Sequence, residues 1–281
     1  MAAEKSNTPS FSPVIRAFYE NYNEANRLAT GVFQLEHVRT QEVLTRYLPA
    51  PPAVLLDIGG GPGVYAAWLA RQNYEVHLVD PVPAHLEQAQ QLSAQQPATP
   101  IASLTRGDAR ALAFAAACAD AVLLLGPLYH LVHRQDRLAA LREARRVLRP
   151  GGILCAAIIS RFASALEGLF QNSLRDPLFA EIVQRDLSDG QHRNPTENIF
   201  YFTEAYFHRV EEIEDEIQEA GLQHERTLAL EGPGWLLQDF EAAWQEPARR
   251  AQILQMVRRL EGERTLLGVS AHIMAIARKI P

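Results

Sequence analysis

The chain has 281 residues, 47% of them hydrophobic and 21% charged, with a formal net charge of −6. This length and hydrophobic content suffice for one large buried core with insertions. The mildly acidic balance argues against a nucleic-acid partner, because duplex binding depends on neutralising phosphates. No apolar run is long enough to cross a bilayer, and we expect no membrane partner.

The two cysteines, Cys118 and Cys155, form no CxxC pair and have no metal-ligand spacing. Cys155 lies in an apolar run and is expected to be a small core residue. The N-terminus lacks the apolar segment of a signal peptide. We therefore expect a cytoplasmic protein with no bound metal, acting as a monomer or homodimer.

The first 48 residues are predicted to be a helical N-terminal cap. Residues 1–12 show no periodicity and are expected to be disordered. From Pro13 to Leu48 apolar residues recur every three or four positions, with a break at Gly31. The prolines at 49–52 end this region.

From residue 49 to 160, short apolar segments alternate with amphipathic segments of helical length. The expected strands cover 53–58, 75–80, 101–107, 119–125 and 153–159, and the expected helices cover 64–72, 84–95 and 134–148. Such alternation predicts an α/β fold with a Rossmann-like, mostly parallel sheet. We expect this segment to be the ligand-binding core.

The rest of the chain first interrupts the alternation and then completes it. Residues 161–208 combine a helical pattern with a polar stretch, and we interpret them as an insertion, or lid, over the ligand edge of the sheet. Residues 209–281 add a helix, strands over 222–230 and 270–278, and a helical insertion near 237–262. The prediction is therefore a seven-stranded sheet with helices on both faces.

Glycines gather where the first strand meets the first helix, in the segment Asp57-Ile-Gly-Gly-Gly-Pro-Gly63. Such a loop lets a ligand approach the backbone closely, and it lies at the strand edge where open α/β sheets bind ligands. The dinucleotide pattern G-x-G-x-x-G fails in both registers, because Val64 or Tyr65 stands at the third glycine position. An NAD(P)-dependent oxidoreductase is therefore disfavoured and remains an alternative.

The segment Asp57-x-Gly59-x-Gly61-x-Gly63 resembles motif I of the class I S-adenosylmethionine (SAM)-dependent methyltransferases. Further landmarks of that family follow in order, namely Asp80, Gly107-Asp108-Ala109, the strand 120–126 and the turn 146–152. The layout is similar to that of small-molecule, type 11-like methyltransferases, including ubiquinone-type and natural-product enzymes. The resemblance is strong over about residues 50–160, and it implies that 49–160 is a SAM-binding core.

The resemblance implies a role for each of three acidic side chains. Asp57 would favour the ammonium side of SAM, Asp80 would accept hydrogen bonds from the ribose hydroxyls, and Asp108 would accept one from the adenine amine. The expected cofactor-binding residues are Asp57, Gly59, Gly61, Gly63, Asp80, Pro81, Asp108, Ala109, Gly126, Tyr19, Tyr22 and Arg27.

The polar residues of the N-terminal cap are Tyr19, Tyr22, Arg27, Glu36, His37 and Arg39. In similar methyltransferases such a segment covers the SAM pocket. The alternative is a surface helix with a solvated polar face.

Methyl transfer is an in-line displacement, so much of the catalysis can come from positioning, and a base is needed only if the acceptor must lose a proton. Tyr129 and His130, after the fourth strand, are the candidate catalytic residues; the alternative is that they pack the loop. An Asn/Asp-Pro-Pro-Tyr motif, typical of methylation at amino groups of bases or glutamine, is replaced by Gly-Pro-Leu-Tyr at 126–129. We predict a methyltransferase with an unidentified small-molecule acceptor. A non-catalytic SAM-binding regulatory protein is a further alternative.

Overall fold

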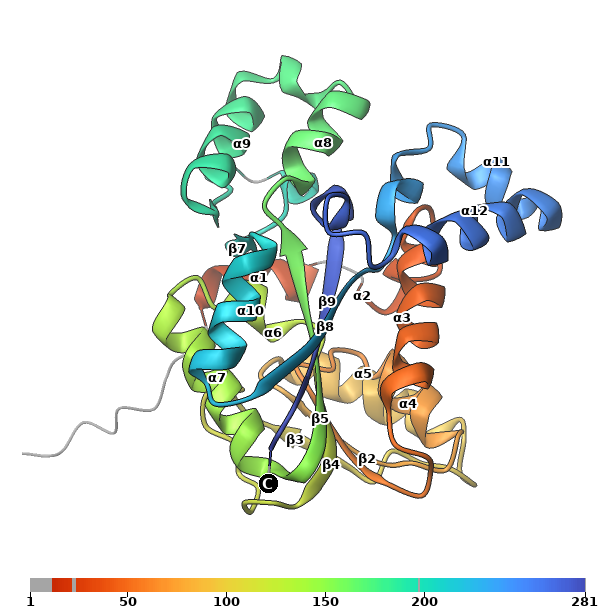
Figure 1. Cartoon of the computed structure of the whole chain (residues 1–281), viewed down its shortest axis with the longest axis vertical. Helices are drawn as coiled ribbons and strands as arrows, with labels where there is room; N and C mark the ends of the chain where they lie inside the picture. The colour runs from red at the N-terminus through yellow and green to blue at the C-terminus, as the bar shows by residue number, and fades with distance from the viewer. Residues whose placement is uncertain (1–11, 22–23, 197, 281) are drawn as a thin grey trace, which may run out of the picture.

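The structure is a computed structural model that describes residues 12–21, 24–196 and 198–280. The expected disorder of the first residues falls almost wholly outside this range, and so does the predicted cofactor residue Tyr22. A central sheet lies between two groups of helices, and further helices extend beyond one end of its strands (Figure 1). Within the described residues, no helix combines the length and the apolar character needed to span a membrane.

All seven predicted strands are present, with slightly different bounds. They are β1 (Val54–Ile58), β2 (Glu75–Asp80), β3 (Ser103–Arg106), β4 (Ala119–Leu124), β5 (Leu148–Ser160), β8 (Gln223–Ala229) and β9 (His272–Arg278). Their pairing gives the order β3-β2-β1-β4-β5-β9-β8, in which the first five are parallel and β9 is antiparallel to both of its neighbours. The prediction of a mostly parallel Rossmann-like sheet is confirmed.

Two short strands extend this sheet and were not predicted. β6 (Gln191–His192) pairs with β7 (Ala205–His208), and β7 runs parallel to the last two residues of β5. The ladder between β4 and β5 ends at Ala156, so the end of β5 would present unpaired backbone groups without β7. From the sequence we expected a helical pattern and a polar stretch in 161–208 and no strand, because no period-2 pattern marks a strand of four residues.

The helices follow the apolar periodicity of the sequence. They are α1 (Pro13–Asn21), α2 (Glu24–Arg27), α3 (Phe33–Tyr47), α4 (Val64–Ala70), α5 (Pro83–Ala94), α6 (Pro127–His130), α7 (Arg134–Val147), α8 (Ala163–Phe170), α9 (Pro177–Asp189), α10 (Val210–Glu219), α11 (Phe240–Gln245) and α12 (Pro247–Leu260). Short 3₁₀ turns occur at Ser173–Arg175, Ile199–Tyr201, Gly232–Leu236 and Leu267–Val269.

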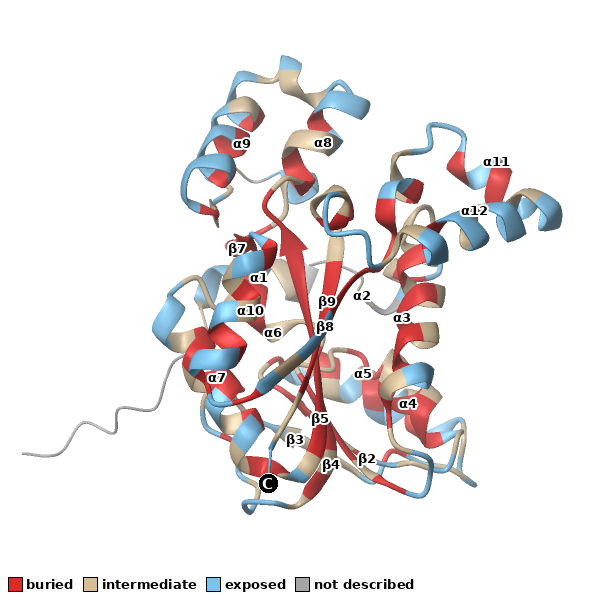
Figure 2. Cartoon of the chain, viewed as in Figure 1, coloured by how far each residue is buried: buried red, intermediate tan, exposed pale blue. Residues whose placement is uncertain are grey.

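Two apolar layers hold the helices on the sheet. Helices α7 and α10 pack against one face and α3, α4 and α5 against the other, each with its buried stripe turned inward (Figures 1 and 2). In α7, for example, Leu138, Leu141 and Ala144 are fully buried while Arg142 is exposed. This rigid packing brings the ends of β1, β2 and β4 together at one edge.

Candidate functional site

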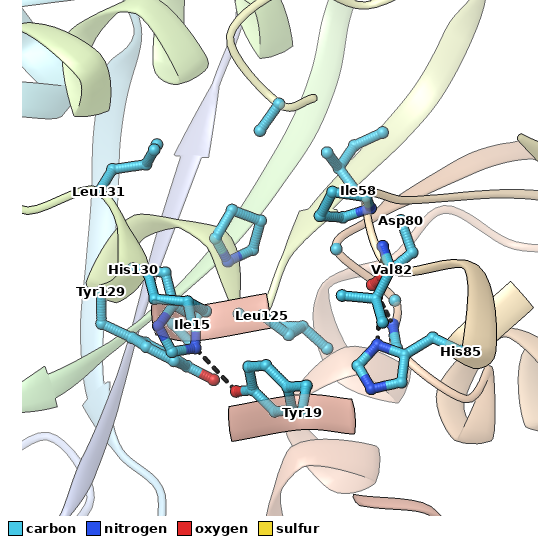
Figure 3. A pocket seen from close by; sticks show the side chains of 18 of the residues that line it. Ile15, Tyr19, Ile58, Asp80, Val82, His85, Leu125, Tyr129, His130 and Leu131 are labelled. Atoms are coloured by element: carbon cyan, nitrogen blue, oxygen red, sulfur yellow. Dashed lines mark hydrogen bonds and ion pairs between the residues drawn. The ribbon is translucent and has the colours of Figure 1, made fainter. Parts of the chain in front are cut away.

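A cavity of about 420 Å³ lies at the carboxyl ends of β1, β2 and β4, with side chains of α1 opposite (Figure 3). Most of the predicted site residues line it. They are Tyr19, Arg27, Asp57, Gly59, Gly61, Asp80, Pro81, Asp108, Ala109, Gly126, Tyr129 and His130. Gly63 is not part of the lining; it is buried below the loop against Ala89.

The glycine loop has no space for side chains at two of its positions. A Cβ on Gly59 would lie 2.6 Å from Cγ of Pro127, and Gly59 has a φ of +70°. A Cβ on Gly60 would lie 2.7 Å from Oδ2 of Asp57. The loop backbone is therefore pressed against the loop after β4 and covers the Asp57 carboxylate.

Asp80, at the end of β2, organises the same loop. One of its oxygens accepts a hydrogen bond from the Gly61 amide at 2.9 Å, and the other accepts one from the Val82 amide at 2.9 Å. His85 Nδ1 is 3.1 Å from that second oxygen. Because an ionised carboxylate can accept about four hydrogen bonds, Asp80 keeps capacity for ligand hydroxyls while it shapes the loop.

Asp57 is buried with no balancing charge beside it among the described residues. It is 1% exposed, and its Oδ2 atom has no hydrogen-bond partner among the described residues. Burial, helped by the nearby Asp80 charge, raises the pKa of Asp57 to about 7. A buried carboxylate normally has a partner, so this position favours a ligand that carries a positive charge or donates hydrogen bonds.

Asp108 is already engaged by a residue that the sequence analysis did not consider. Arg110 donates to it from its backbone amide and Nε, each at 2.9 Å, and from Nη2 at 2.7 Å. Nη1 of the same guanidinium lies 3.2 Å from Asp136. Any ligand that reaches Asp108 therefore meets an ion pair with Arg110 and not a free carboxylate.

Tyr19 and His130 meet across the cavity (Figure 3). The Tyr19 hydroxyl lies 2.7 Å from His130 Nε2, and His130 Nδ1 lies 3.3 Å from the backbone carbonyl of Glu204. Since a carbonyl only accepts, Nδ1 carries the proton and Nε2 accepts from Tyr19. Burial lowers the pKa of His130 to about 4, so the ring is neutral at pH 7.

Tyr129 both lines the cavity and packs the loop. Its ring joins an apolar cluster with Ile159, Ala163 and Phe207. A Cβ on Gly126 would lie 3.6 Å from the Tyr129 hydroxyl oxygen, which places that oxygen beside the loop after β4. The two interpretations left open for Tyr129, packing and access to the ligand, are therefore compatible.

A charged cluster beside the cavity joins side chains of α2, α3, β9 and the loop after β8. Arg27 pairs with both oxygens of Glu36, at 2.5 and 2.9 Å. His272 Nδ1 lies 2.7 Å from Glu231 and 3.7 Å from Glu36. Sequence reasoning identified Arg27 and noted Glu36, but Glu231 and His272 were missed because no local motif links them to the N-terminal cap.

The other polar residues of the cap lie elsewhere. Arg39 is fully buried and bonds to the carbonyl of Leu230 and to Glu42 and Glu261. His37 is not part of the cavity lining. The prediction that the cap faces the ligand site therefore has support at Tyr19, Arg27 and Glu36.

One group of described residues has the composition of a metal site. Ligand atoms of Glu36, Glu231 and His272 lie within 4.8 Å of one another. Glu36 already pairs with Arg27, and Nδ1 of His272 faces Glu231. Each carboxylate of the cluster therefore already has a partner among its own side chains.

Comparison with known proteins agrees with this geometry. Residues 56–156 match the family model described as a methyltransferase domain. A ubiquinone biosynthesis O-methyltransferase of Cereibacter sphaeroides is 33% identical over 153 residues, which cover 53% of this chain and 56% of that protein. The ubiquinone/menaquinone biosynthesis C-methyltransferase UbiE of Caulobacter vibrioides is 33% identical over 150 residues, covering 48% of this chain and 55% of that protein. The chain thus spans about half the length of the curated relatives it matches.

Solved structures show the same fold over a longer stretch. A SAM-dependent methyltransferase of Thermotoga maritima, described as a possible histamine N-methyltransferase, superposes with a TM-score of 0.58 and 20% identity. The match covers 95% of this chain and 99% of that one. Residues 56–156 thus match a methyltransferase domain, and the chain as a whole has the fold of the SAM-dependent methyltransferase from Thermotoga maritima.

Proposed function

We propose that this protein transfers a methyl group from SAM to a small-molecule acceptor bound in the cavity. The observation that carries the proposal is the buried carboxylate of Asp57, which lacks a partner among the described residues and lies directly under the glycine loop. SAM carries an ammonium group and a sulfonium centre. A cationic ligand beside Asp57 would offset the desolvation that raises its pKa.

The other cavity residues fit the remaining groups of SAM. Asp80 keeps acceptor capacity for ribose hydroxyls, and Asp108, held by Arg110, would accept from the adenine amine. Arg27 uses three of its five N–H groups on Glu24 and Glu36, which leaves donors for a carboxylate. A cavity of about 420 Å³ is within the usual size range of small-molecule sites.

The bound donor would supply a methyl group that is already activated on sulfur. The protein would then act mainly by alignment and by excluding water. We propose that the N-terminal cap (1–48) and the insertion (161–208) together cover the ligand site. Tyr19 of the cap and Arg193 and Glu204 of the insertion line the cavity.

Calorimetric titration with SAM, S-adenosylhomocysteine and NAD tests the proposal. We expect both sulfur compounds to bind and NAD not to bind. In Asp80→Ala, SAM affinity should fall roughly tenfold to hundredfold, because hydrogen bonds to a charged acceptor contribute about 1.5–3 kcal/mol. Asp239→Ala, at an exposed acid paired with Arg249, is the matched control and should bind as the wild type does. NAD binding without SAM binding by the folded protein would refute the proposal.

A further inference from the structure

We propose that His272, held by Glu231, accepts the proton of an aromatic hydroxyl group on the methyl acceptor, so that the methyl group is transferred to oxygen. This inference rests on the proposed function and adds to it the proton-accepting residue and the class of acceptor. It is carried by the hydrogen bonds of His272 and by its position on the sheet.

Glu231 fixes His272 in one tautomer. Glu231 is 2% exposed, and one of its carboxylate oxygens lies 2.7 Å from Nδ1 of His272. Its other oxygen accepts from the backbone amide of His272 at 2.9 Å and lies 2.8 Å from the Ser270 hydroxyl. A carboxylate so placed only accepts, so Nδ1 of the imidazole carries the proton and Nε2 presents its lone pair.

Nε2 is the ring atom of His272 that remains available. No described residue forms a hydrogen bond with it, and the side chain, 16% exposed, lines the cavity. His130 differs, because its Nε2 accepts from Tyr19 and its Nδ1 faces the Glu204 carbonyl. Of these two cavity histidines, His272 is the one that can take a proton without losing an existing hydrogen bond.

The strand order places His272 away from the predicted SAM-binding acids. His272 begins β9 and pairs with Ile159 near the end of β5, whereas Asp80 ends β2. Between β2 and β9 lie β1, β4 and β5, so the two side chains are separated by four strand spacings, roughly 19 Å. A donor bound over β2, β1 and β4 would leave the space over β5 and β9 for the acceptor.

The part of the cavity around His272 would accommodate a methyl acceptor that is flat and apolar with one polar end. This part of the cavity is lined by Ala157 of β5, Met274 of β9 and Leu230, which directly follows β8. Glu36 and Arg27 form the polar end beside the imidazole. An aromatic ring can cover the apolar residues while its hydroxyl reaches Nε2.

Proton transfer to an imidazole base requires an acceptor with an acidic hydroxyl group. The acceptor O–H proton moves to Nε2, the oxygen forms a bond to the methyl carbon, and the carbon–sulfur bond breaks with its electron pair remaining on the neutral sulfur. The imidazolium is stabilised by Glu231 and afterwards releases its proton to solvent. A phenol has a pKa near that of tyrosine, about 10, which is close enough for an imidazole base, whereas an aliphatic alcohol is far less acidic.

The charges around His272 support this role. Burial alone would lower its pKa, but the carboxylates of Glu36 and Glu231 outweigh burial and the Arg27 charge, and the pKa of His272 is raised above its usual value. An imidazole of raised basicity holds a transferred proton better. Methyl transfer should therefore decline as pH falls through this raised pKa, because the ring is then protonated before the acceptor binds.

The test uses 4-nitrocatechol, whose colour reports ionisation of its hydroxyl, titrated with protein saturated by S-adenosylhomocysteine so that no turnover occurs. We expect the bound probe to ionise about 1–3 pH units below the free probe, since a cation forms beside it. His272→Asn should abolish this difference, because an amide can still donate to Glu231 but cannot accept the proton. His224→Asn is the matched control, at a histidine beside Glu214 outside the cavity.

Turnover gives the second readout. With SAM and 4-nitrocatechol, kcat of His272→Asn should fall by about 10²–10⁴, with SAM affinity unchanged and KM for the catechol little affected. Glu231→Gln should retain a smaller ionisation difference, as expected for a positioning residue.

Failure of this inference is distinguishable from failure of the proposed function. If SAM binds but the probe fails to bind, or ionises equally in wild type and His272→Asn, the role of His272 is refuted while the proposed function stands. Methylation of benzylamine in place of the catechol would also refute it. If the folded wild type binds neither SAM nor S-adenosylhomocysteine, both are refuted.

Discussion

Replacing Asp57 by asparagine should make the ligand-free protein more stable and its SAM complex weaker. Asp57 is 1% exposed, and burial together with Asp80 raises its pKa to about 7. An unfolded aspartate has a pKa of about 3.9. Above pH 7 the folded protein therefore contains a carboxylate that water would stabilise better, and asparagine removes that charge without changing the size of the side chain.

The size of the effect follows from the pKa difference. A difference of about 3 pH units at 1.36 kcal/mol per unit gives an upper limit of about 4 kcal/mol. Because the folded pKa is the higher one, the contribution of Asp57 to stability is complete below about pH 4 and is lost progressively as pH rises to about 7. The asparagine variant does not lose this stability. The excess of its free energy of unfolding over that of the wild type should therefore grow between about pH 4 and pH 7 and then remain constant.

Urea unfolding of both proteins at several pH values between 5 and 8 measures this advantage. Calorimetry at pH 8 should show SAM affinity roughly tenfold to hundredfold lower in the variant, because a charged acceptor has been lost. At pH 6, SAM binding should release a proton from the wild type but not from Asp57→Asn. A variant that is less stable than the wild type at pH 8, or that binds SAM equally well, would refute the reasoning.

Two further substitutions test the loop and the cap. Gly59→Ala should be less stable than Gly151→Ala by about 1–3 kcal/mol in chemical denaturation. Both glycines have positive φ, but only a Cβ at position 59 would meet Pro127, at 2.6 Å. Equal stability of the two variants would contradict this close approach. Tyr19→Phe should cost about 1 kcal/mol of unfolding free energy, because it removes the hydroxyl that lies 2.7 Å from His130. An unchanged ¹⁵N chemical shift of His130 Nε2 in that variant would show that the bond is not made.

The predictable features of this protein are those whose sequence pattern is local, within a few consecutive residues. Buried parallel strands are mainly apolar, and the glycine loop follows one such strand directly, so β1, β2 and β4 and their ligand edge follow from local pattern. β7 escaped prediction because four residues are too few to show a period. It exists because β5 extends past β4 and needs a partner.

The sequence by itself therefore determined the strand–helix alternation and the collection of Asp57 and Asp80 at one edge, since each is set by residues next to it in the chain. Only the tertiary structure decided which charges are paired. It left Asp57 without a described partner and joined Glu231 to His272, 41 residues away. The physical reason is that the protonation and reactivity of a side chain depend on burial and on neighbouring charges, and these neighbours come from elements that are distant in sequence.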